Sequence, residues 1–258
     1  MEWYTKLTKQ EWDESIQKLL KEKSDQNIKD LLIDSVKKRT EKEFALLFSG
    51  GLDSSLLALT CKNLRLKFKC YYIGTENSKD LTYAREIAKK FNLEYKERII
   101  NEKDIQKIIK KVKNLVPPGF VNLDLGILFY LALEFVKEKN IITGAGAEEL
   151  FAGYARHRNS KQVRKDCIND LKTIYERDLI RTKSLSKHFN KNILTPFLDK
   201  YLIISAFSRE IKKDKFILRE IAKELGLGEY SERKKLAGQY GSGIDKLLKK
   251  ILKNEKTN

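Results

Sequence analysis

A short apolar run that ends in two glycines constrains the fold of this chain more than any other feature. The stretch is FALLFSGGLDSSLLAL, residues 44–59. A continuous apolar run of this length is typical of a strand buried on both faces of a parallel sheet. After Gly51 the apolar residues recur at helical spacing. Gly50 and Gly51 allow a sharp turn between the two elements, so the stretch predicts a strand, a glycine turn and a helix.

The same alternation continues along the chain. FKCYYIG, LTYAREIAKKFN and EYKERII predict a strand, a helix and a strand between residues 68 and 100. IITGAGAEEL, at 141–150, repeats the order of buried strand, glycine turn and helix start. This pattern is typical of a doubly wound, mostly parallel α/β sheet, which binds ligands at the carboxyl ends of its strands.

The rest of the sequence has helical periodicity. Two helices are expected within residues 11–40, a long apolar helix follows Pro117 and Pro118, and the end of the chain is mostly helical. No Gly/Ser-rich linker or internal repeat divides the sequence. We expect a single domain over 1–258, with N-terminal helices at 1–40, a nucleotide-binding α/β core at 41–155 and a helical part at 156–258.

Charge and composition narrow the class of protein only partly. Lys and Arg outnumber Asp and Glu by 53 to 36, and the formal charge of +17 is spread along the chain. This favours an anionic partner, but a lysine-rich chain with two His is equally typical of thermophiles. No apolar run reaches the roughly 18 residues of a membrane span, and the first residues lack the core of a signal peptide. We expect a cytoplasmic protein without a membrane partner.

The three cysteines do not form a recognisable site. Cys61, Cys70 and Cys167 are odd in number and far apart in the sequence. This argues against a disulfide framework, a zinc site or an iron–sulfur cluster. We expect them to be small buried hydrophobic residues.

The first glycine turn has the composition of a pyrophosphate site. Backbone N–H groups, serine hydroxyls and the positive end of the following helix form an anion cradle. The Walker lysine is missing, and Asp53 stands in the turn instead. A carboxylate beside phosphates requires a divalent cation between them. A turn whose serines only cap the helix is the alternative. The predicted cradle consists of Ser49, Gly50, Gly51, Asp53, Ser54 and Ser55.

With its preceding helix IKDLLIDSVKKRT, this turn resembles the synthetase domain of glutamine-dependent asparagine synthetase. That domain belongs to the SGGxDS-type ATP pyrophosphatases, also called PP-loop enzymes, which include β-lactam synthetase and have an adenine nucleotide alpha hydrolase-like fold. The resemblance covers residues 28–245 or so. It rests on four further blocks in the family's order: YYIGTENSKDLTYAREIA, ITGAGAEELFAGYARH, TPFLDKYLI, and KDKFILREIAKELG with ERKKLAGQYGSG.

The resemblance implies a reaction and its substrates. A small carboxylate attacks the α-phosphate of ATP and pyrophosphate leaves. A nitrogen nucleophile, from ammonia or an amine, then displaces AMP from the acyl-adenylate, so that an amide forms. The implied requirements are ATP and Mg²⁺.

Individual residues match the family's positions. Asp53 falls on a magnesium ligand, and Glu148 falls on a second metal-binding acid that is usually Asp. Lys215 matches the lysine that stabilises charge at the α-phosphate, and Lys235 a basic residue at the pyrophosphate exit. The positions that hold adenosine are matched by Leu47, Ile73, Thr143 and Gly144.

Departures from the family pattern concern the nitrogen donor and the acceptor. Met1-Glu2 stands where the family's glutaminase domain has its cysteine, so we expect no glutamine hydrolysis by that route and a possible separate glutaminase subunit. Ala145 replaces an acid of asparagine synthetases, or the tyrosine base of β-lactam synthetase. Glu149, Tyr154 and His157 are the nearby candidates for a base. Only His157 has an ordinary pKa near neutrality, although an exposed, structurally unimportant histidine is the alternative.

Asn192 and Leu194 replace the family's Glu-x-Arg before the Pro-Phe-Leu-Asp motif, so the acceptor is expected to differ from that of ordinary asparagine synthetase. A tRNA-modifying ATP pyrophosphatase is the main alternative, because the charge suits a phosphate backbone, although extra RNA-binding domains and paired cysteines are missing. A non-catalytic nucleotide-binding subunit is a third. The oligomeric state, including a homodimer, is left open.

Overall fold

Five parallel strands form one sheet at the centre of this computed structural model, which describes residues 2–40, 42–233 and 241–254. The strand order is β3-β2-β1-β4-β5, and every neighbouring pair is parallel. The chain leaves β1 in one direction for β2 and β3 and then returns to its other side for β4 and β5. This doubly wound order confirms the predicted fold class, and it places a ligand crevice beside the carboxyl end of β1. The strands are β1 (Phe44–Leu47), β2 (Phe68–Gly74), β3 (Tyr95–Ile99), β4 (Asn140–Ile142) and β5 (Asn192–Leu194).

The central strand is buried on both faces, as its continuous apolar run predicts. Successive side chains alternate across a strand, so Phe44 and Leu46 belong to one hydrophobic core and Ala45 belongs to the other. In register, Ala45 lies between Lys69 of β2 and Ile141 of β4. The carboxyl ends of β1, β2 and β4 therefore meet at one edge.

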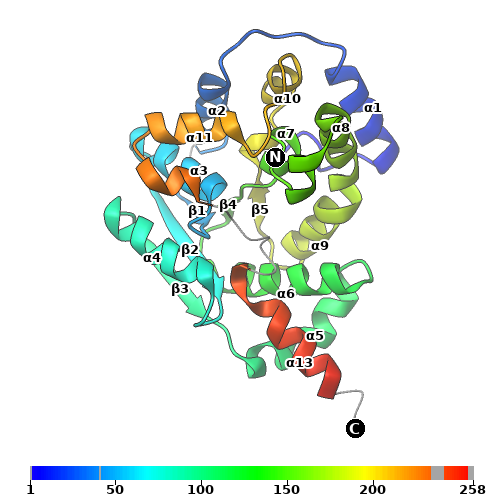
Figure 1. The fold of residues 1–258 in the computed structure, drawn as a ribbon. Coiled ribbons are helices and arrows are strands. Elements are labelled where there is room, and N and C mark those ends of the chain that lie inside the picture. The colour runs from blue at the N-terminus through cyan, green and yellow to red at the C-terminus, as the bar shows by residue number, and fades with distance from the viewer. Residues whose placement is uncertain (1, 41, 234–240, 255–258) are drawn as a thin grey trace.

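Helices cover both faces of the sheet (Figure 1). On one face, α5, α6 and α13 lie together and form the smaller core with β1, β2 and β4. The larger core on the other face contains residues from the N-terminal helices and from much of the second half. The helices of the first half are α1 (Lys9–Leu19), α2 (Ile28–Lys37), α3 (Leu52–Asn63), α4 (Lys79–Lys90), α5 (Glu102–Leu115) and α6 (Phe120–Phe135).

The second half is mostly helical, as predicted, but it also contributes the edge strand β5, which the sequence analysis missed. Between α8 and α9 the helix widens into a π-helix, η2. The α-helices are α7 (Ala147–Leu150), α8 (Val163–Ile174), α9 (Ile180–His188), α10 (Lys200–Phe207), α11 (Phe216–Glu224) and α13 (Ile244–Asn254). The π-helix is η2 (Tyr175–Leu179), and 3-10 turns are η1 (Ala155–Asn159), η3 (Pro196–Leu198) and η4 (Gly228–Glu232).

Two further expectations concern cysteines and membrane spans. Cys61, Cys70 and Cys167 are all buried and free, as expected. Burial raises the pKa of the Cys61 thiol to about 12.

Among the described helices, no single one is long and apolar enough to cross a membrane.

Candidate nucleotide and acceptor site

The first glycine turn lies between β1 and α3, with Gly51 as the N-cap of the helix. Gly50 has a left-handed backbone (φ +63°), and a Cβ there would lie 2.6 Å from the backbone nitrogen of Ala84 in α4. Glycine is therefore required both by conformation and by the close approach of α4. The hydroxyl of Ser54 donates to the carbonyl of Gly51 (3.1 Å), and the Gly51 N–H donates to the hydroxyl of Ser49 (3.3 Å).

Arg233 holds this turn from the C-terminal part of the chain. One guanidinium nitrogen donates to the carbonyl of Gly50 (2.8 Å), and another pairs with the buried carboxylate of Asp80 on α4. The guanidinium also lies over the ring of Tyr83, 3.7 Å from its centroid, in a cation–π geometry. Sequence analysis did not select Arg233 or Asp80, although Arg233 belongs to the block that carries Lys235.

A cavity of about 350 Å³ opens at the carboxyl ends of the strands, beside the glycine turn. Three predicted cradle residues do not line it, namely Gly50, Gly51 and Ser55. The Ser55 hydroxyl is buried and has no hydrogen-bond partner among the described residues, so its contact with pyrophosphate stays a prediction. Lys235 lies outside the described residues. The predicted residues that do line the cavity are Leu47, Ser49, Asp53, Ser54, Ile73, Thr143, Gly144 and Glu148.

Asp53, Glu148 and Lys215 meet although they are far apart in the sequence. The Lys215 ammonium contacts both carboxylate oxygens of Asp53 (2.8 and 2.7 Å) and Oε1 of Glu148 (2.7 Å). Burial lowers the pKa of Lys215, but the two carboxylates outweigh burial, and the net pKa is raised. Lys215 is therefore a fixed, buried cation at neutral pH.

The backbone is strained where it presents this lysine. Asp214 and Lys215 both have left-handed conformations (φ 57° and 56°). Their N–H groups donate to the carbonyls of Ala152 (3.1 Å) and Phe151 (2.9 Å), which fixes the bend before α11. Two consecutive non-glycine residues in this region are unfavourable, and such strain clusters at functional sites. Gly153 leaves room for the contact, since a Cβ there would lie 2.1 Å from Oε2 of Glu148.

The donor set suits one kind of metal ion better than others. Among the described residues, no group of three or more His, Cys, Asp or Glu side chains could enclose a metal ion. Asp53 and Glu148 nevertheless converge on a single cationic atom, the Lys215 nitrogen. Mg²⁺ is commonly held by one or two carboxylates together with substrate phosphates. The two carboxylates therefore fit Mg²⁺ carried in by a nucleotide.

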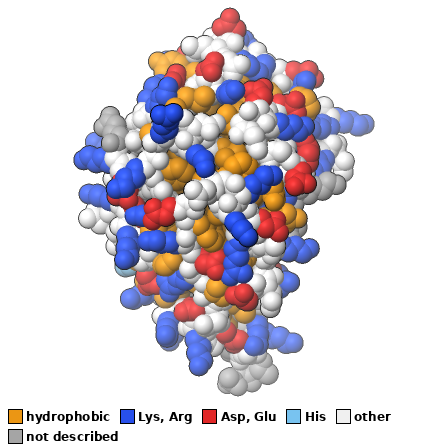
Figure 2. Space-filling model, turned by 90° about the vertical axis from the view of Figure 1, so that its left-hand side faces the viewer, with side chains coloured by type: hydrophobic (Ala, Val, Ile, Leu, Met, Phe, Trp, Pro, Cys, Tyr) orange, Lys and Arg blue, Asp and Glu red, His pale blue; other side chains and the backbone are white. Residues whose placement is uncertain are grey.

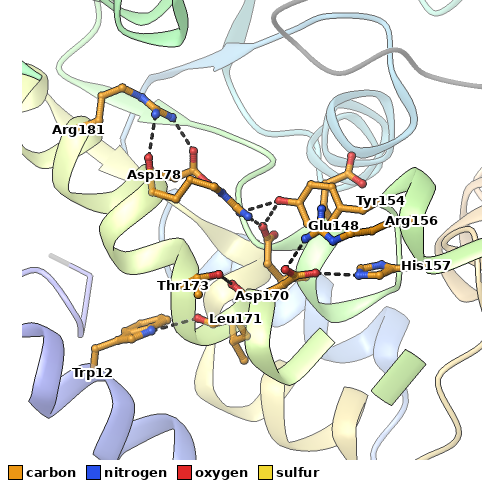
Figure 3. Close-up of polar contacts among 12 residues, drawn as sticks. Trp12, Glu148, Tyr154, Arg156, His157, Asp170, Leu171, Thr173, Asp178 and Arg181 are labelled. Carbon is orange, nitrogen blue, oxygen red and sulfur yellow. Dashed lines mark hydrogen bonds and ion pairs between the residues drawn. The ribbon is translucent and has the colours of Figure 1, made fainter. Parts of the chain in front are cut away.

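The far wall of the cavity carries charged side chains of α7, η2 and α9. Figure 3 shows the polar contacts around Tyr154, Asp178 and Arg181. Glu149 is buried and accepts hydrogen bonds from the Tyr154 hydroxyl and from Arg177. Burial raises the pKa of Glu149 to about 7, opposed by Arg177 and by the Tyr154 hydrogen bond. Ala145 also lines the cavity.

The π-helix η2 supplies the rest of this wall. Arg177 donates through Nε to Oδ2 of Asp178 (2.7 Å), and Arg181 donates to Oδ1 of the same carboxylate (2.5 Å). Arg181 also donates to Oδ1 of Asn122 on α6 (3.0 Å). Asp178, Arg181 and Thr182 line the cavity. Sequence analysis missed all of them, because neither a motif nor the helical periodicity distinguishes them from other surface charges.

His157 does not fulfil either expectation for it. The ring is fully buried rather than exposed, so the surface alternative was wrong. Its Nε2 contacts Oδ2 of Asp170 on α8 at 2.7 Å, and it is not among the described cavity residues. Trp12 likewise anchors α1, donating to the carbonyl of Leu171 (3.0 Å). His157 and Trp12 hold helices together beside the site.

Asn192 and Leu194 of β5, which the sequence analysis expected to alter the choice of acceptor, do not line the cavity. The exposed Asn192 amide donates to the side chain of Asn140 (2.9 Å), and Leu194 is buried. Neither is among the described lining residues, whereas the adjacent Thr195 is.

Known proteins resemble this chain over most of its length. It is 28% identical over 290 aligned positions (91% of the chain) to a protein assigned as asparagine synthetase [glutamine-hydrolyzing] 1 of Methanocaldococcus jannaschii, of which it covers 53%. It is 29% identical to the asparagine synthetase of Gallus gallus over 75% of the chain and 39% of that protein. The chain thus spans about half or less of these relatives.

A solved structure and a family model also match this chain. The NH3-dependent NAD synthetase of Campylobacter jejuni aligns with 95% of this chain and 85% of its own, at a TM-score of 0.44 and 21% identity. The profile of the family described as asparagine synthase matches residues 27–166. That segment covers more than half of the chain and contains both glycine turns with Asp53 and Glu148. The chain belongs to the asparagine synthase family.

Proposed function

We propose that this protein is an ATP-dependent, AMP-forming ligase that joins a carboxylate to ammonia or an amine. The single observation that carries the proposal is the contact of Lys215 with Asp53 and Glu148 at the glycine turn. A buried lysine that bridges two carboxylates beside a phosphate cradle suits chemistry at a nucleotide phosphate. A site for nucleotide binding alone does not require it.

ATP would lie along the carboxyl ends of β1, β2 and β4. Leu47 and Ile73 offer apolar contacts to adenosine, and Thr143 with Gly144 closes the other side. The glycine turn, with Ser49 and Ser54, would take the pyrophosphate through N–H and hydroxyl groups. Lys235 is proposed at the pyrophosphate exit. Asp53 and Glu148 would hold Mg²⁺, which supplies positive charge to neutralise the phosphates.

In the first step a carboxylate oxygen of the acceptor forms a bond to the α-phosphorus. The bond from that phosphorus to the bridging oxygen breaks, and pyrophosphate leaves with the electron pair. Lys215 stays protonated and stabilises the negative charge that develops on the α-phosphate oxygens. Its contacts with Asp53 and Glu148 keep it beside the glycine turn, and its ammonium would turn to the α-phosphate when the two carboxylates take up Mg²⁺.

In the second step the amine nitrogen attacks the acyl carbon. The bond from carbon to the phosphate oxygen breaks, AMP leaves with the electron pair, and the nitrogen loses a proton. Ala145 cannot accept that proton. Glu149, which lines the cavity and accepts a hydrogen bond from Tyr154, is proposed as the group that takes it.

The test is to identify the nucleotide products. The purified chain is incubated with ATP, Mg²⁺, ammonium and a panel of carboxylic acids, and the products are separated by chromatography. The proposal predicts AMP and pyrophosphate in equal amounts, dependent on an acid, and no turnover after chelation of Mg²⁺. Release of ADP and phosphate would contradict it.

A tRNA-modifying function is a second candidate, favoured by two lysine stripes. Four lysines of α5 recur at helical spacing, and four of α13 do the same. Figure 2 shows a face on which basic and acidic side chains are intermixed. Pyrophosphate release that depends on tRNA and falls steeply with salt would support this candidate. The stripes are Lys103, Lys107, Lys110 and Lys111 on α5, and Lys246, Lys249, Lys250 and Lys253 on α13.

A further inference from the structure

We infer that the far wall of the cavity selects an acceptor with a single carboxylate, whose remaining part is neutral or carries an ammonium group, and rejects dicarboxylates. The inference rests on the proposed function, because it concerns the acid that would be adenylated. The far wall is defined as Glu149, Tyr154, Asp178, Arg181 and Thr182, the polar side chains between residues 149 and 182 that line the cavity.

The cavity wall has an excess of acid. Among the described residues that line it, five are carboxylic acids and one is an arginine. With their partners Lys215, Arg177 and Arg233, which are not among the lining residues, the five acids face four cations. The reacting carboxylate of an acceptor is directed toward ATP and its cation. A second carboxylate would have to find its own cation on the remaining wall, or lie uncompensated beside the acids. The acids are Asp53, Asp80, Glu148, Glu149 and Asp178, and the arginine is Arg181.

The cations near the far wall already have carboxylate partners. Asp178 accepts from Arg177 through one oxygen and from Arg181 through the other. Arg177 also contacts Glu149, and Arg181 also donates to Asn122. A substrate carboxylate that captured either arginine would leave Asp178 or Glu149 with one cation fewer in a partly desolvated site. Breaking such a pair is costly.

The backbone keeps these pairs in place. Asp178 belongs to the π-helix η2, and Arg181 follows it in α9; Arg181 also donates to the carbonyl of Arg177 (2.8 Å). Figure 3 shows Asp178 and Arg181 paired on this helix, with Tyr154 across from them. Segments of π-helix are rare and occur frequently at functional sites. We assign to η2 the placement of a neutralised acid–base pair at the acceptor end.

An ammonium group would meet a different environment. The wall offers it the carboxylates of Asp178 and Glu149 and the hydroxyl of Thr182 as acceptors. Aspartate and β-alanine both carry a carboxylate on a CH₂ group. Aspartate has one further carboxylate, on the carbon that bears its ammonium group. The wall therefore favours β-alanine over aspartate, and likewise γ-aminobutyrate over glutamate.

The test uses the wild-type chain with matched pairs of acids. ATP–pyrophosphate exchange is measured with β-alanine and L-aspartate, γ-aminobutyrate and L-glutamate, and propionate and succinate. The inference predicts that kcat/KM is higher, by about tenfold or more, for the monocarboxylate of each pair that exchanges. Equal or better exchange with the dicarboxylates overturns the inference and leaves the ligase function standing. Exchange with none of the acids would mean that adenylation itself fails, and the inference with it.

A variant tests the assignment to Asp178. Asp178→Asn removes the carboxylate that neutralises Arg177 and Arg181, so the ratio of kcat/KM for dicarboxylate over monocarboxylate should rise about tenfold. Asp178→Glu should keep the wild-type preference. The matched control is Glu134→Gln on α6, which removes the carboxylate partner of Arg98 on β3 (2.7 Å). An unchanged ratio in Asp178→Asn overturns the assignment. If Asp178→Asn does not fold, the exchange rates of the wild-type chain with the matched pairs of acids decide whether the cavity prefers monocarboxylates.

Discussion

The two ends of the cavity are built in different ways. The nucleotide end consists of a glycine turn, short side chains and strand ends, with Lys215 placed between two carboxylates. The acceptor end consists of long side chains from α7 to α9, where arginines pair with Asp178 and Glu149. The first end holds most of the residues that the sequence analysis selected, whereas the second depends on the pairs of Asp178 with Arg177 and Arg181, which it did not select.

This difference leads us to expect different effects from mutations at the two ends. Backbone N–H groups at strand ends can be placed only where the sheet places them, so the nucleotide end tolerates little change. Side chains on helices can change without moving the backbone. Loss of activity should therefore follow from changes at the nucleotide end, and changed preference should follow from changes at the acceptor end.

The largest effect is expected from Lys215→Ala. Removal of the buried cation should slow turnover by roughly a hundredfold or more, about 3 kcal/mol in the activation free energy, because a preorganised charge is lost. Binding of Mg²⁺–ATP should change by only a few-fold. Steady-state kinetics with a separate nucleotide-binding titration measures both effects.

Two neighbouring lysines serve as controls for that variant. Lys213 donates to the carbonyl of Arg158, and Lys212 lies over the ring of Phe216, so neither contacts the cavity carboxylates. Lys212→Ala and Lys213→Ala should keep near wild-type turnover. A hundredfold loss in either, with Lys215→Ala active, would show that the wrong lysine was assigned.

A smaller effect is expected from Gly50→Ala. The added Cβ meets the backbone of α4 and sits on a left-handed residue, so the free energy of unfolding should fall by about 2–3 kcal/mol. ATP affinity should fall with it. Gly226 is also left-handed (φ +90°) but has no atom within 4 Å of its Cβ position. Gly226→Ala should therefore cost only about 1 kcal/mol, and equal losses in denaturant melts would contradict a tight packing of the turn on α4.

The smallest effect concerns a charge behind the acceptor end. Asp124 of α6 is buried, and neither of its oxygens has a hydrogen-bond partner among the described residues. Burial and the neighbouring Asp245 raise its pKa to about 7, opposed by Lys249 and Arg181. The folded chain therefore holds a proton that the unfolded chain, with an ordinary carboxyl pKa of about 3.9, releases. The stabilising contribution is complete below about pH 4 and is lost as the pH rises through 7.

Asp124→Asn should remove this pH dependence. A pKa of about 7 against 3.9 corresponds to roughly 4 kcal/mol at pH 8. The buried Asn amide also lacks a partner, so the variant should be more stable than wild type at pH 8 by only about 1–2 kcal/mol. Urea melts across the range from about pH 4 to pH 8 measure the difference. Asp34→Asn changes an exposed carboxyl on α2 and is the control. A variant that is less stable than wild type at pH 8 would mean that the Asp124 carboxylate makes a favourable contact when ionised.

The sequence predicted the sheet well, for a physical reason. A buried parallel strand needs a continuous apolar run, and a turn against a neighbouring helix needs glycine, so both leave local signals such as FALLFSGG. The strand at Phe68–Gly74 has the predicted bounds. Asp53 and Glu148 each follow a glycine turn, and this position in the sequence helped to select them as candidate metal ligands.

The sequence could not reveal the parts that depend on distant contacts. β5 is three residues long and gains its strand character by pairing with β4. His157 was expected at the surface, because its burial depends on Asp170 of α8. The pairs of Asp178 with Arg177 and Arg181 depend on the π-helical turn, which no local pattern indicates. The position of the Arg233 side chain depends on its contacts with Gly50 and Asp80, which are far away in the chain.

The most direct test of the account is to follow the oxygen atoms of the acceptor. An acid that supports turnover, labelled with ¹⁸O in its carboxylate, is incubated with ATP, Mg²⁺ and ammonium, and the products are analysed by mass spectrometry. Attack of the carboxylate on the α-phosphate predicts one ¹⁸O in the phosphate of AMP and none in pyrophosphate. Unlabelled AMP, or label in released phosphate, would contradict the proposed chemistry at the nucleotide end.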